Sequence, residues 1–281
     1  MTTLDRRLNA FRPDLADERL AGQVEAERFV AGEEAFVSMP VVNVHTAPDR
    51  YSGMDTQLLH GDGVCVFERG AGWAWVQAAR DRYVGYVEES ALTQTQAAST
   101  HVVSVPRSFV YPEPELKTPP VTAHSMGARV AVVEEVENRG TLYAVLASGE
   151  AMIARHLLPV GAVFTDFVSV AEQFIHAPYL WGGASGFGLD CSGLVQLSMF
   201  MAGQRVPRDT YMQANIGSEV ETEVKRGDLV FWRGHVAILT DDENVIHANG
   251  YTMTVSREPL AEATRRIEPF YGRPVGFRRL L

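Results

Sequence analysis

Apolar and polar residues alternate along the first half of the chain, in short runs that Gly and Pro residues separate. The clearest runs are residues 41–44, 64–67, 73–76 and 83–87. Alternation with a period of two residues is typical of half-buried β-strands. We therefore predict a small β-module over residues 36–98, preceded by an arm with helical turns over residues 1–35.

The same pattern returns more weakly over residues 99–160. A shift of 66 positions aligns four residues of the first module with four of the second, Gly61, Val64, Val66 and Glu68 with Gly127, Val130, Val132 and Glu134. A degenerate repeat of this kind indicates two copies of one small unit. We therefore expect two β-modules in series before residue 161.

Residues 161–281 show helical periodicity first and apolar strands afterwards. One helix is predicted from Thr165 or Asp166 to residue 175, and a second from about residue 191 to Gly203. Apolar runs within 227–239 and 244–248, and a last one near 274–281, predict strands. Helices followed by a sheet favour an α+β domain with a papain-like layout.

Composition narrows the classes of partner. The chain has 281 residues and a formal net charge of −10, which argues against nucleic acid and anionic membranes. It has only two Cys residues, so a disulfide framework is excluded and a free reactive thiol suits a reducing compartment. Charges near the N-terminus and the absence of a run of ~18 apolar residues predict a cytoplasmic protein. The sequence indicates no obligate protein partner.

The segment around Cys191 carries the strongest chemical signal. A glycine-rich stretch leads into residues 189–196 (LDCSGLVQ), where the second predicted helix begins. Unpaired N–H groups and the dipole at a helix N-terminus favour a thiolate, the nucleophilic form of Cys. Cys191 is therefore a candidate nucleophile. Cys65 lies inside an alternating run and is expected to be a small buried apolar residue.

Two histidines downstream supply a candidate base. His235 and His247 lie 12 residues apart, in apolar runs that a polar turn separates. A hairpin would place them side by side, so Cys191, His235 and His247 fit a nucleophile, a base and a residue that orients the base. A zinc site made of the same three residues is the alternative, but no C-x-x-C or H-x-x-x-H spacing supports it. We predict no metal and no cofactor.

The motifs of this half resemble those of the NlpC/p60 cysteine peptidases of bacterial cell-wall metabolism. Six occur in the family's order, 179–183 (YLWGG), 190–194 (DCSGL), 207–209 (PRD), 227–231 (GDLVF), 234–238 (GHVAI) and 245–248 (VIHA). The resemblance implies that Cys191, His235 and His247 are the catalytic residues. It further implies an oxyanion contact from Tyr179 and substrate contacts from Asp190 and Ser192. A helix N-cap is the alternative role for Asp190.

The two β-modules resemble bacterial SH3-type barrels, the second being diverged and rich in Pro. The complete arrangement is similar to that of γ-D-glutamyl-L-diamino acid endopeptidases. In those relatives an acidic residue and a Tyr of the first barrel bind the free amine of an N-terminal L-Ala. Tyr83 matches the Tyr, and Asp55 is the better match for the acid, with Asp81 as its competitor.

The expected function is therefore hydrolysis of the γ-D-glutamyl bond to diaminopimelate or Lys in recycled murein peptides. The expected partner is the murein-derived peptide itself. Two alternatives stay open: an SH3-type peptide-binding protein with an inert catalytic domain, and another acyl chemistry on the same scaffold, such as that of an amidase, a transpeptidase or an acyltransferase.

Overall fold

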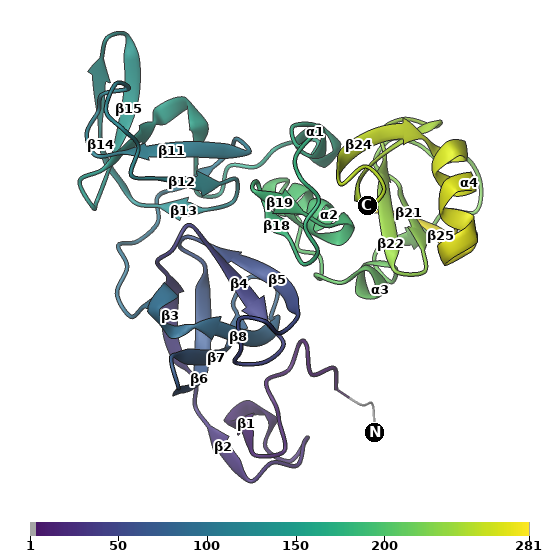
Figure 1. The fold of residues 1–281 in the computed structure, drawn as a ribbon, viewed down its shortest axis with the longest axis horizontal. Helices are drawn as coiled ribbons and strands as arrows, with labels where there is room; N and C mark the ends of the chain where they lie inside the picture. Colours follow the sequence, from purple (N-terminus) through teal and green to yellow (C-terminus); the bar gives the residue numbers. More distant parts are fainter. Residues whose placement is uncertain (1–3, 281) are drawn as a thin grey trace. The chain divides into compact units, whose positions relative to one another are not determined.

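The structure, a computed structural model, describes residues 4–280. The first three residues of the predicted arm and the last residue of the predicted catalytic domain lie outside this range. The chain divides into two compact units, Met1–Val160 and Gly161–Leu281. Figure 1 shows the strand-rich first unit in purple to teal and the second unit, which contains the longer helices, in green to yellow.

The first β-module is one seven-stranded sheet with the order β5-β4-β8-β7-β6-β3-β9. Its strands are β3 (Glu33–Val37), β4 (Val41–His45), β5 (Met54–Leu59), β6 (Gly63–Gly70), β7 (Trp73–Ala78), β8 (Val84–Glu88) and β9 (Leu92–Thr93), with the 3-10 turn η2 (Glu89–Ala91) before β9. Alternate residues of these strands, among them Val42, Val44, Val64 and Val66, form its core. Core residues alternate along β4, β6 and β7, as the period-two pattern in the sequence predicts, although the other face of β7 is buried as well.

The N-terminal arm contains more extended structure than the helical turns we expected. It forms β1 (Leu15–Asp17), the 3-10 turn η1 (Glu18–Leu20) and β2 (Arg28–Val30), and β1 pairs with β2 in parallel. Ala10 and Leu15 are buried in a cluster with Phe67 and Trp75 of the first module. This packing against the module gives the arm an ordered path that its mixed, polar sequence does not predict.

The second β-module repeats the strand order of the first. Its strands are β10 (His101–Val103), β11 (Arg107–Tyr111), β12 (Thr122–Ser125), β13 (Arg129–Val130), β14 (Val132–Asn138), β15 (Thr141–Leu146), β16 (Ala151–Ile153) and β17 (Leu157–Pro159), with η3 (Ala154–His156) before β17. They form the sheets β12-β11-β16-β15-β14 and β13-β10-β17. The order matches that of the first module once β13 and β14 together take the place of β6.

Hydrogen bonds and irregularities recur at the same positions in both modules. The Gly61 N–H donates to the Val37 carbonyl at 2.9 Å, and the Gly127 N–H donates to the Val103 carbonyl at 2.9 Å. Both glycines have a positive φ, +80° and +88°, which favours glycine. The ladder shifts register between Val66 and Glu68 in one module and between Val132 and Glu134 in the other. The repeat predicted at an offset of 66 is therefore a structural repeat.

The second unit is α+β, with a six-stranded sheet in the order β20-β25-β21-β22-β23-β24. Its strands are β20 (Ser218–Glu219), β21 (Leu229–Trp232), β22 (His235–Leu239), β23 (Asn244–Asn249), β24 (Thr254–Pro259) and β25 (Gly276–Arg279), with the small hairpin β18 (Ala184–Ser185) and β19 (Gly188–Leu189). Its helices are α1 (Phe167–Glu172), α2 (Cys191–Met201), α3 (Thr210–Gln213) and α4 (Leu260–Tyr271).

Helices α1 and α2 begin where the sequence predicts. Asp166 caps α1 by accepting a hydrogen bond from the Val168 N–H, although the regular helix ends at Glu172, before the expected residue 175. Gly203 follows α2 with a positive φ of +79°, as a residue just after a helix end often does. Helix α4 was not predicted. Its Ala263 and Ile267 join the core beside Val230 and Leu239 of the sheet.

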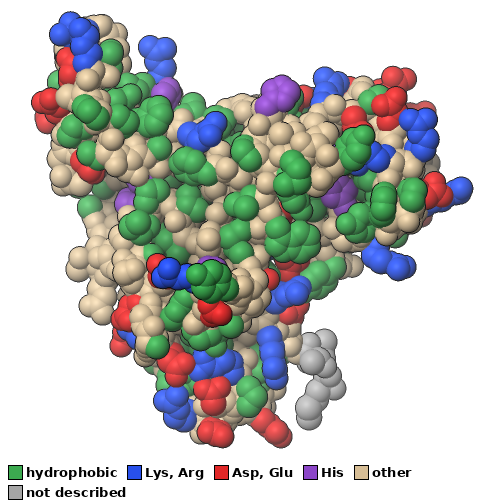
Figure 2. Space-filling model, viewed as in Figure 1, with side chains coloured by type: hydrophobic (Ala, Val, Ile, Leu, Met, Phe, Trp, Pro, Cys, Tyr) green, Lys and Arg blue, Asp and Glu red, His purple; other side chains and the backbone are tan. Residues whose placement is uncertain are grey.

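The surface carries charges of both signs. On the face shown in Figure 2, Lys and Arg side chains are interspersed with Asp and Glu side chains. This face therefore has no continuous basic stripe. Among residues 4–280, no helix is long and apolar enough to cross a bilayer.

Candidate active site

Cys191 is the first residue of α2, and its side chain is largely buried at the start of that helix. Asp190 is the N-cap residue, since its Oδ1 accepts a hydrogen bond from the Gly193 N–H at 2.7 Å. A Cβ atom on Gly193 would lie 2.1 Å from the Gly183 carbonyl oxygen. Only glycine fits at this position, so the glycine-rich loop can seat directly against the end of the helix that carries the thiol.

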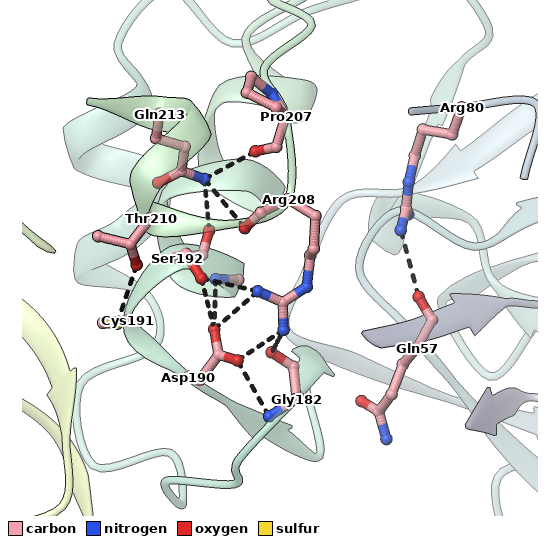
Figure 3. Close-up of polar contacts among 12 residues, drawn as sticks. Gln57, Arg80, Gly182, Asp190, Cys191, Ser192, Pro207, Arg208, Thr210 and Gln213 are labelled. Carbon is pink, nitrogen blue, oxygen red and sulfur yellow. Dashed lines mark hydrogen bonds and ion pairs between the residues drawn. The ribbon is translucent and has the colours of Figure 1, made fainter. Parts of the chain in front are cut away.

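A buried ion pair holds this helix end in place. Arg208, which is 1% exposed, forms two hydrogen bonds with the Asp190 carboxylate, at 2.9 and 2.6 Å. The Ser192 hydroxyl accepts from Arg208 at 2.8 Å and donates to Asp190 at 3.1 Å, and the second carboxylate oxygen also accepts from the Gly182 N–H at 3.0 Å. Figure 3 shows Asp190 between Arg208 and the Gly182 backbone. The structure thus uses Asp190 and Ser192 to build the loop, and their contact with substrate stays a prediction.

Replacing Arg208 with Met should destabilise the second unit strongly. The change leaves the buried Asp190 carboxylate without its guanidinium partner, and breaking a buried ion pair costs about 3 kcal/mol of unfolding free energy. The matched control is Arg226→Met, because Arg226 pairs with Asp166 and Glu172 at half-exposed positions. Such exposed pairs contribute at most about 1 kcal/mol. Urea unfolding followed by tryptophan fluorescence measures both losses, and equal losses would contradict the role given to the Arg208 pair.

The two predicted histidines meet as the hairpin spacing requires. Strands β22 and β23 are antiparallel, with Ile238 opposite Ile246. Nε2 of His235 lies 2.8 Å from Nδ1 of His247, and His247 is fully buried. On its other side, Nε2 of His247 lies 2.7 Å from Oε1 of Glu258. This leaves the Nδ1 atom of His235 as the ring nitrogen outside the contact with His247.

The thiol lies beside the strand that carries His235. The backbone N–H of Val236, one residue after His235, lies close enough to the Cys191 side chain to lower the pKa of its thiol. The Thr210 hydroxyl lies 3.8 Å from the Cys191 sulfur, at the start of α3. Tyr179 is close enough to Cys191 and Asp190 for their charges to act on it. Burial, followed by these two groups, raises the pKa of the Tyr179 phenol to about 12, so its hydroxyl stays a hydrogen-bond donor at neutral pH.

The expectation of a resting thiolate at Cys191 is wrong. Burial, followed by the neighbouring Asp190 carboxylate, raises the pKa of the Cys191 thiol to about 11. Burial, followed by His247 and Arg266, lowers the pKa of His235 to about 3. Desolvation of the charged form is the largest cause of both shifts in pKa. At neutral pH the site therefore holds a thiol and a neutral imidazole, and the thiol proton must move to a base during attack.

The structure places Asp55, Asp81 and Tyr83 in the first β-module. Asp55 lies on β5, half-buried, and Tyr83 lies just before β8 with 2% of its surface exposed. The Asp81 carboxylate accepts a hydrogen bond from the Tyr83 N–H at 3.1 Å, which fixes the turn between β7 and β8. Their roles in binding substrate stay predictions.

Sequence reasoning missed three residues near Cys191 and the histidines. Arg208 belongs to the motif at 207–209 (PRD), but its position in the sequence does not show that it pairs with Asp190. Thr210 is two residues further on. Glu258 comes to His247 through the pairing of β24 with β23, in which Val245 lies opposite Glu258 and His247 opposite Ser256. An acidic residue about one strand length after His247 is the only signal, and it is a weak one. Among residues 4–280, no group of three His, Cys, Asp or Glu side chains is arranged to hold a metal ion.

Two family models match separate parts of the chain, one in each of the two compact units. Residues 176–267 match the NlpC/P60 family, and residues 44–92 match the bacterial dipeptidyl-peptidase Sh3 domain. The first match contains Cys191, His235, His247 and Glu258, and the second contains Asp55, Asp81 and Tyr83.

Two of the similar proteins are named as dipeptidyl-peptidases. The chain is 27% identical over 237 residues to dipeptidyl-peptidase 6 of Lysinibacillus sphaericus, covering 76% of this chain and 87% of that protein. It is 31% identical over 198 residues to gamma-D-glutamyl-L-lysine dipeptidyl-peptidase of Bacillus subtilis, covering 64% of each chain.

The fold is similar to that of a solved NlpC/P60 family protein from Bacillus cereus. The TM-score is 0.75 at 24% identity, and the match covers 89% of this chain and all of that one. Residues 176–267 therefore form an NlpC/P60 domain, and residues 44–92 form an SH3-type domain of the bacterial dipeptidyl-peptidase kind, with which the similar fold agrees.

Proposed function

We propose that the chain is a cysteine endopeptidase that hydrolyses the γ-D-glutamyl bond to a diamino acid, diaminopimelate or Lys, in murein peptides with a free N-terminal L-Ala. One observation carries the proposal. A thiol at a helix N-terminus lies against the strand of a histidine whose ring is hydrogen-bonded to a second histidine at 2.8 Å. The names of two relatives support the bond, since both are called gamma-D-glutamyl-L-lysine dipeptidyl-peptidase.

In the first step the Cys191 sulfur attacks the γ-carbonyl carbon of D-Glu, and the thiol proton passes to Nδ1 of His235. The backbone N–H of Cys191 and the Tyr179 hydroxyl donate to the oxyanion that forms, and one such donor contributes about 3–4 kcal/mol in other enzymes. The carbon–nitrogen bond then breaks, and His235 returns the proton to the departing amine. His247 holds the His235 ring in the orientation that this transfer needs.

Hydrolysis of the thioester completes the cycle. Water attacks the acyl carbon with His235 again taking a proton, and the Cys191 thiol leaves with that proton. The products are L-Ala-γ-D-Glu and either the free diamino acid or the remaining peptide, which now begins with the free amine of the diamino acid. Every proton taken up in the cycle is returned, which fits a site that starts as a thiol and a neutral imidazole.

The proposal also includes the domain boundaries and the cellular location of the enzyme. Residues 1–35 are the arm, residues 36–98 and 99–160 are two SH3-type barrels, and residues 161–281 form a papain-like catalytic domain. The shared strand order and the shared hydrogen bonds of Gly61 and Gly127 support the second barrel. A free N-terminal L-Ala is present in recycled peptides and blocked in intact murein, so we place the enzyme in cytoplasmic peptide recycling.

Acetylating the N-terminal L-Ala of the substrate should lower kcat/KM about tenfold or more. The proposal gives the free ammonium a charge-assisted hydrogen bond to Asp55, with Tyr83 as its second partner. Such bonds contribute about 1.5–3 kcal/mol. Steady-state kinetics on L-Ala-γ-D-Glu-diaminopimelate and its acetylated form measure the loss.

The two candidate carboxylates provide the control for this prediction. Asp55→Asn should reduce turnover of the free peptide and leave that of the acetylated peptide nearly unchanged. Asp81→Asn should affect neither, since the amide oxygen of Asn can still accept from the Tyr83 N–H. The reverse result would transfer the role to Asp81. Equal cleavage of the free peptide, the acetylated peptide and intact sacculus would contradict the recycling proposal.

A further inference from the structure

Glu258 ends a row of hydrogen bonds that begins at His235, on the strand that lies beside the thiol. The row runs from His235 to His247 over 2.8 Å and from His247 to Glu258 over 2.7 Å. It crosses three neighbouring strands, β22, β23 and β24. Glu258 lies opposite Val245, two residues along β23 from His247, so both side chains belong to the same face of the sheet.

The carboxylate sets the direction of every hydrogen bond in the row. An ionised carboxylate only accepts, so Nε2 of His247 must carry the hydrogen. In a neutral ring the other nitrogen, Nδ1, is then an acceptor. The partner of Nδ1 is Nε2 of His235, which must in turn donate. His235 is thereby left with an unprotonated Nδ1, which is the form that can take a proton from a thiol.

The surroundings keep Glu258 ionised. Its side chain is 19% exposed, and it forms an ion pair with Arg266 of α4. Burial alone would raise the pKa of Glu258, but the hydrogen bond from His247 and the charge of Arg266 outweigh it and hold the pKa below its usual range. Arg266 also lies 4.5 Å from the centre of the Tyr251 ring. The charged and titratable groups facing His247 are thus His235, Glu258 and, behind Glu258, Arg266.

We infer that Glu258 is a positioning residue, which acts through His247 to fix the protonated nitrogens of both histidines and so leaves Nδ1 of His235 ready to accept the thiol proton. The catalytic part of this inference rests on the proposed cysteine peptidase activity. The tautomer part concerns the histidines alone and can be tested without turnover. Neither Cys191 nor the substrate contacts Glu258 in this assignment.

Two substitutions of Glu258 distinguish the effect of losing its hydrogen-bond acceptor from the effect of losing its negative charge. Glu258→Leu removes the acceptor and should lower kcat about 30-fold with little change in KM, because the histidines lose their fixed tautomers. Glu258→Gln keeps an oxygen that can accept from His247 and should lose no more than about fivefold. The matched control is Glu262→Leu, an exposed position on the first turn of α4, which should leave kcat unchanged.

Nitrogen-15 NMR of histidine-labelled protein gives the readout that a merely structural role would not move. In the wild type and in Glu258→Gln, His235 and His247 should both be protonated on Nε2. In Glu258→Leu, the two rings should show mixed or reversed tautomers while near-UV circular dichroism stays native. Wild-type kcat or unchanged tautomers in Glu258→Leu would overturn the inference, as would equal losses in the Leu and Gln variants. If the wild type proves inactive on every peptide, the proposed function fails and the NMR result still decides the tautomer assignment.

Discussion

Replacing Cys191 with Ala should abolish peptide hydrolysis, with a loss of at least about 10⁴-fold in kcat. The thiol is the only group placed to form the covalent intermediate in the proposed cycle. The cost in stability should be small, because Ala is compatible with the first position of α2 and Asp190 still caps the helix. Product formation measured over hours, together with urea unfolding, checks both parts.

Cys65 provides the control for that experiment. It lies on β6 in the first module, where burial raises the pKa of its thiol, and it has no place in the proposed chemistry. Cys65→Ser should therefore retain activity. Hydrolysis by Cys191→Ala at a rate near that of the wild type would refute the thiol mechanism. A wild type that binds the peptide without cleaving it would favour the peptide-binding alternative.

Replacing His235 with Ala should lower kcat/KM about 10³-fold, the usual contribution of a positioned general base. With the pKa of the Cys191 thiol near 11, almost no thiolate is present at neutral pH to react without a base. His247→Asn should cost less, about 10- to 100-fold, because the Asn oxygen can still accept from Nε2 of His235. A milder loss at His235 than at His247 would contradict the assigned roles.

The same assignment sets the pH profile. The active form needs a neutral His235, and because its pKa is lowered to about 3, protonation removes activity only as the pH falls toward that value. From pH 8 to pH 5, kcat/KM of the wild type should change less than about threefold. A base with an ordinary pKa of about 6.5 would lose about 30-fold at pH 5. An acid limb centred near pH 6.5 would show that His235 is not the desolvated base described above.

Local patterns predicted the thiol and the two histidines because each rests on short-range geometry. Asp190 before an apolar helical stripe places Cys191 at a helix start, and a separation of 12 residues across a turn brings His235 beside His247. The protonation state of the Cys191 thiol could not be predicted from local patterns. The helix start is visible in the sequence, but the burial that raises the pKa of the Cys191 thiol depends on the complete packing of the unit.

Local patterns predicted neither helix α4 nor the role of Glu258 at the end of the row of hydrogen bonds. The segment is rich in charge and contains Pro269, a residue that disfavours a helix interior, although its buried Ala263 and Ile267 recur at helical spacing. Glu258 acquires its role only through the register of β24 on β23, and Arg208 only through the fold of the loop that returns it to Asp190. These are long-range pairings, which a single sequence does not specify.

The most direct test of the account is mass spectrometry of the products formed from L-Ala-γ-D-Glu-meso-diaminopimelate and its L-Lys counterpart. The wild type should release L-Ala-γ-D-Glu and the free diamino acid from at least one of the two peptides, and Cys191→Ala should release neither. Chelators should leave the reaction unchanged. Uncleaved peptides, cleavage at the L-Ala–D-Glu bond, or equal product from Cys191→Ala would contradict the assignment of this protein as a γ-D-glutamyl cysteine peptidase.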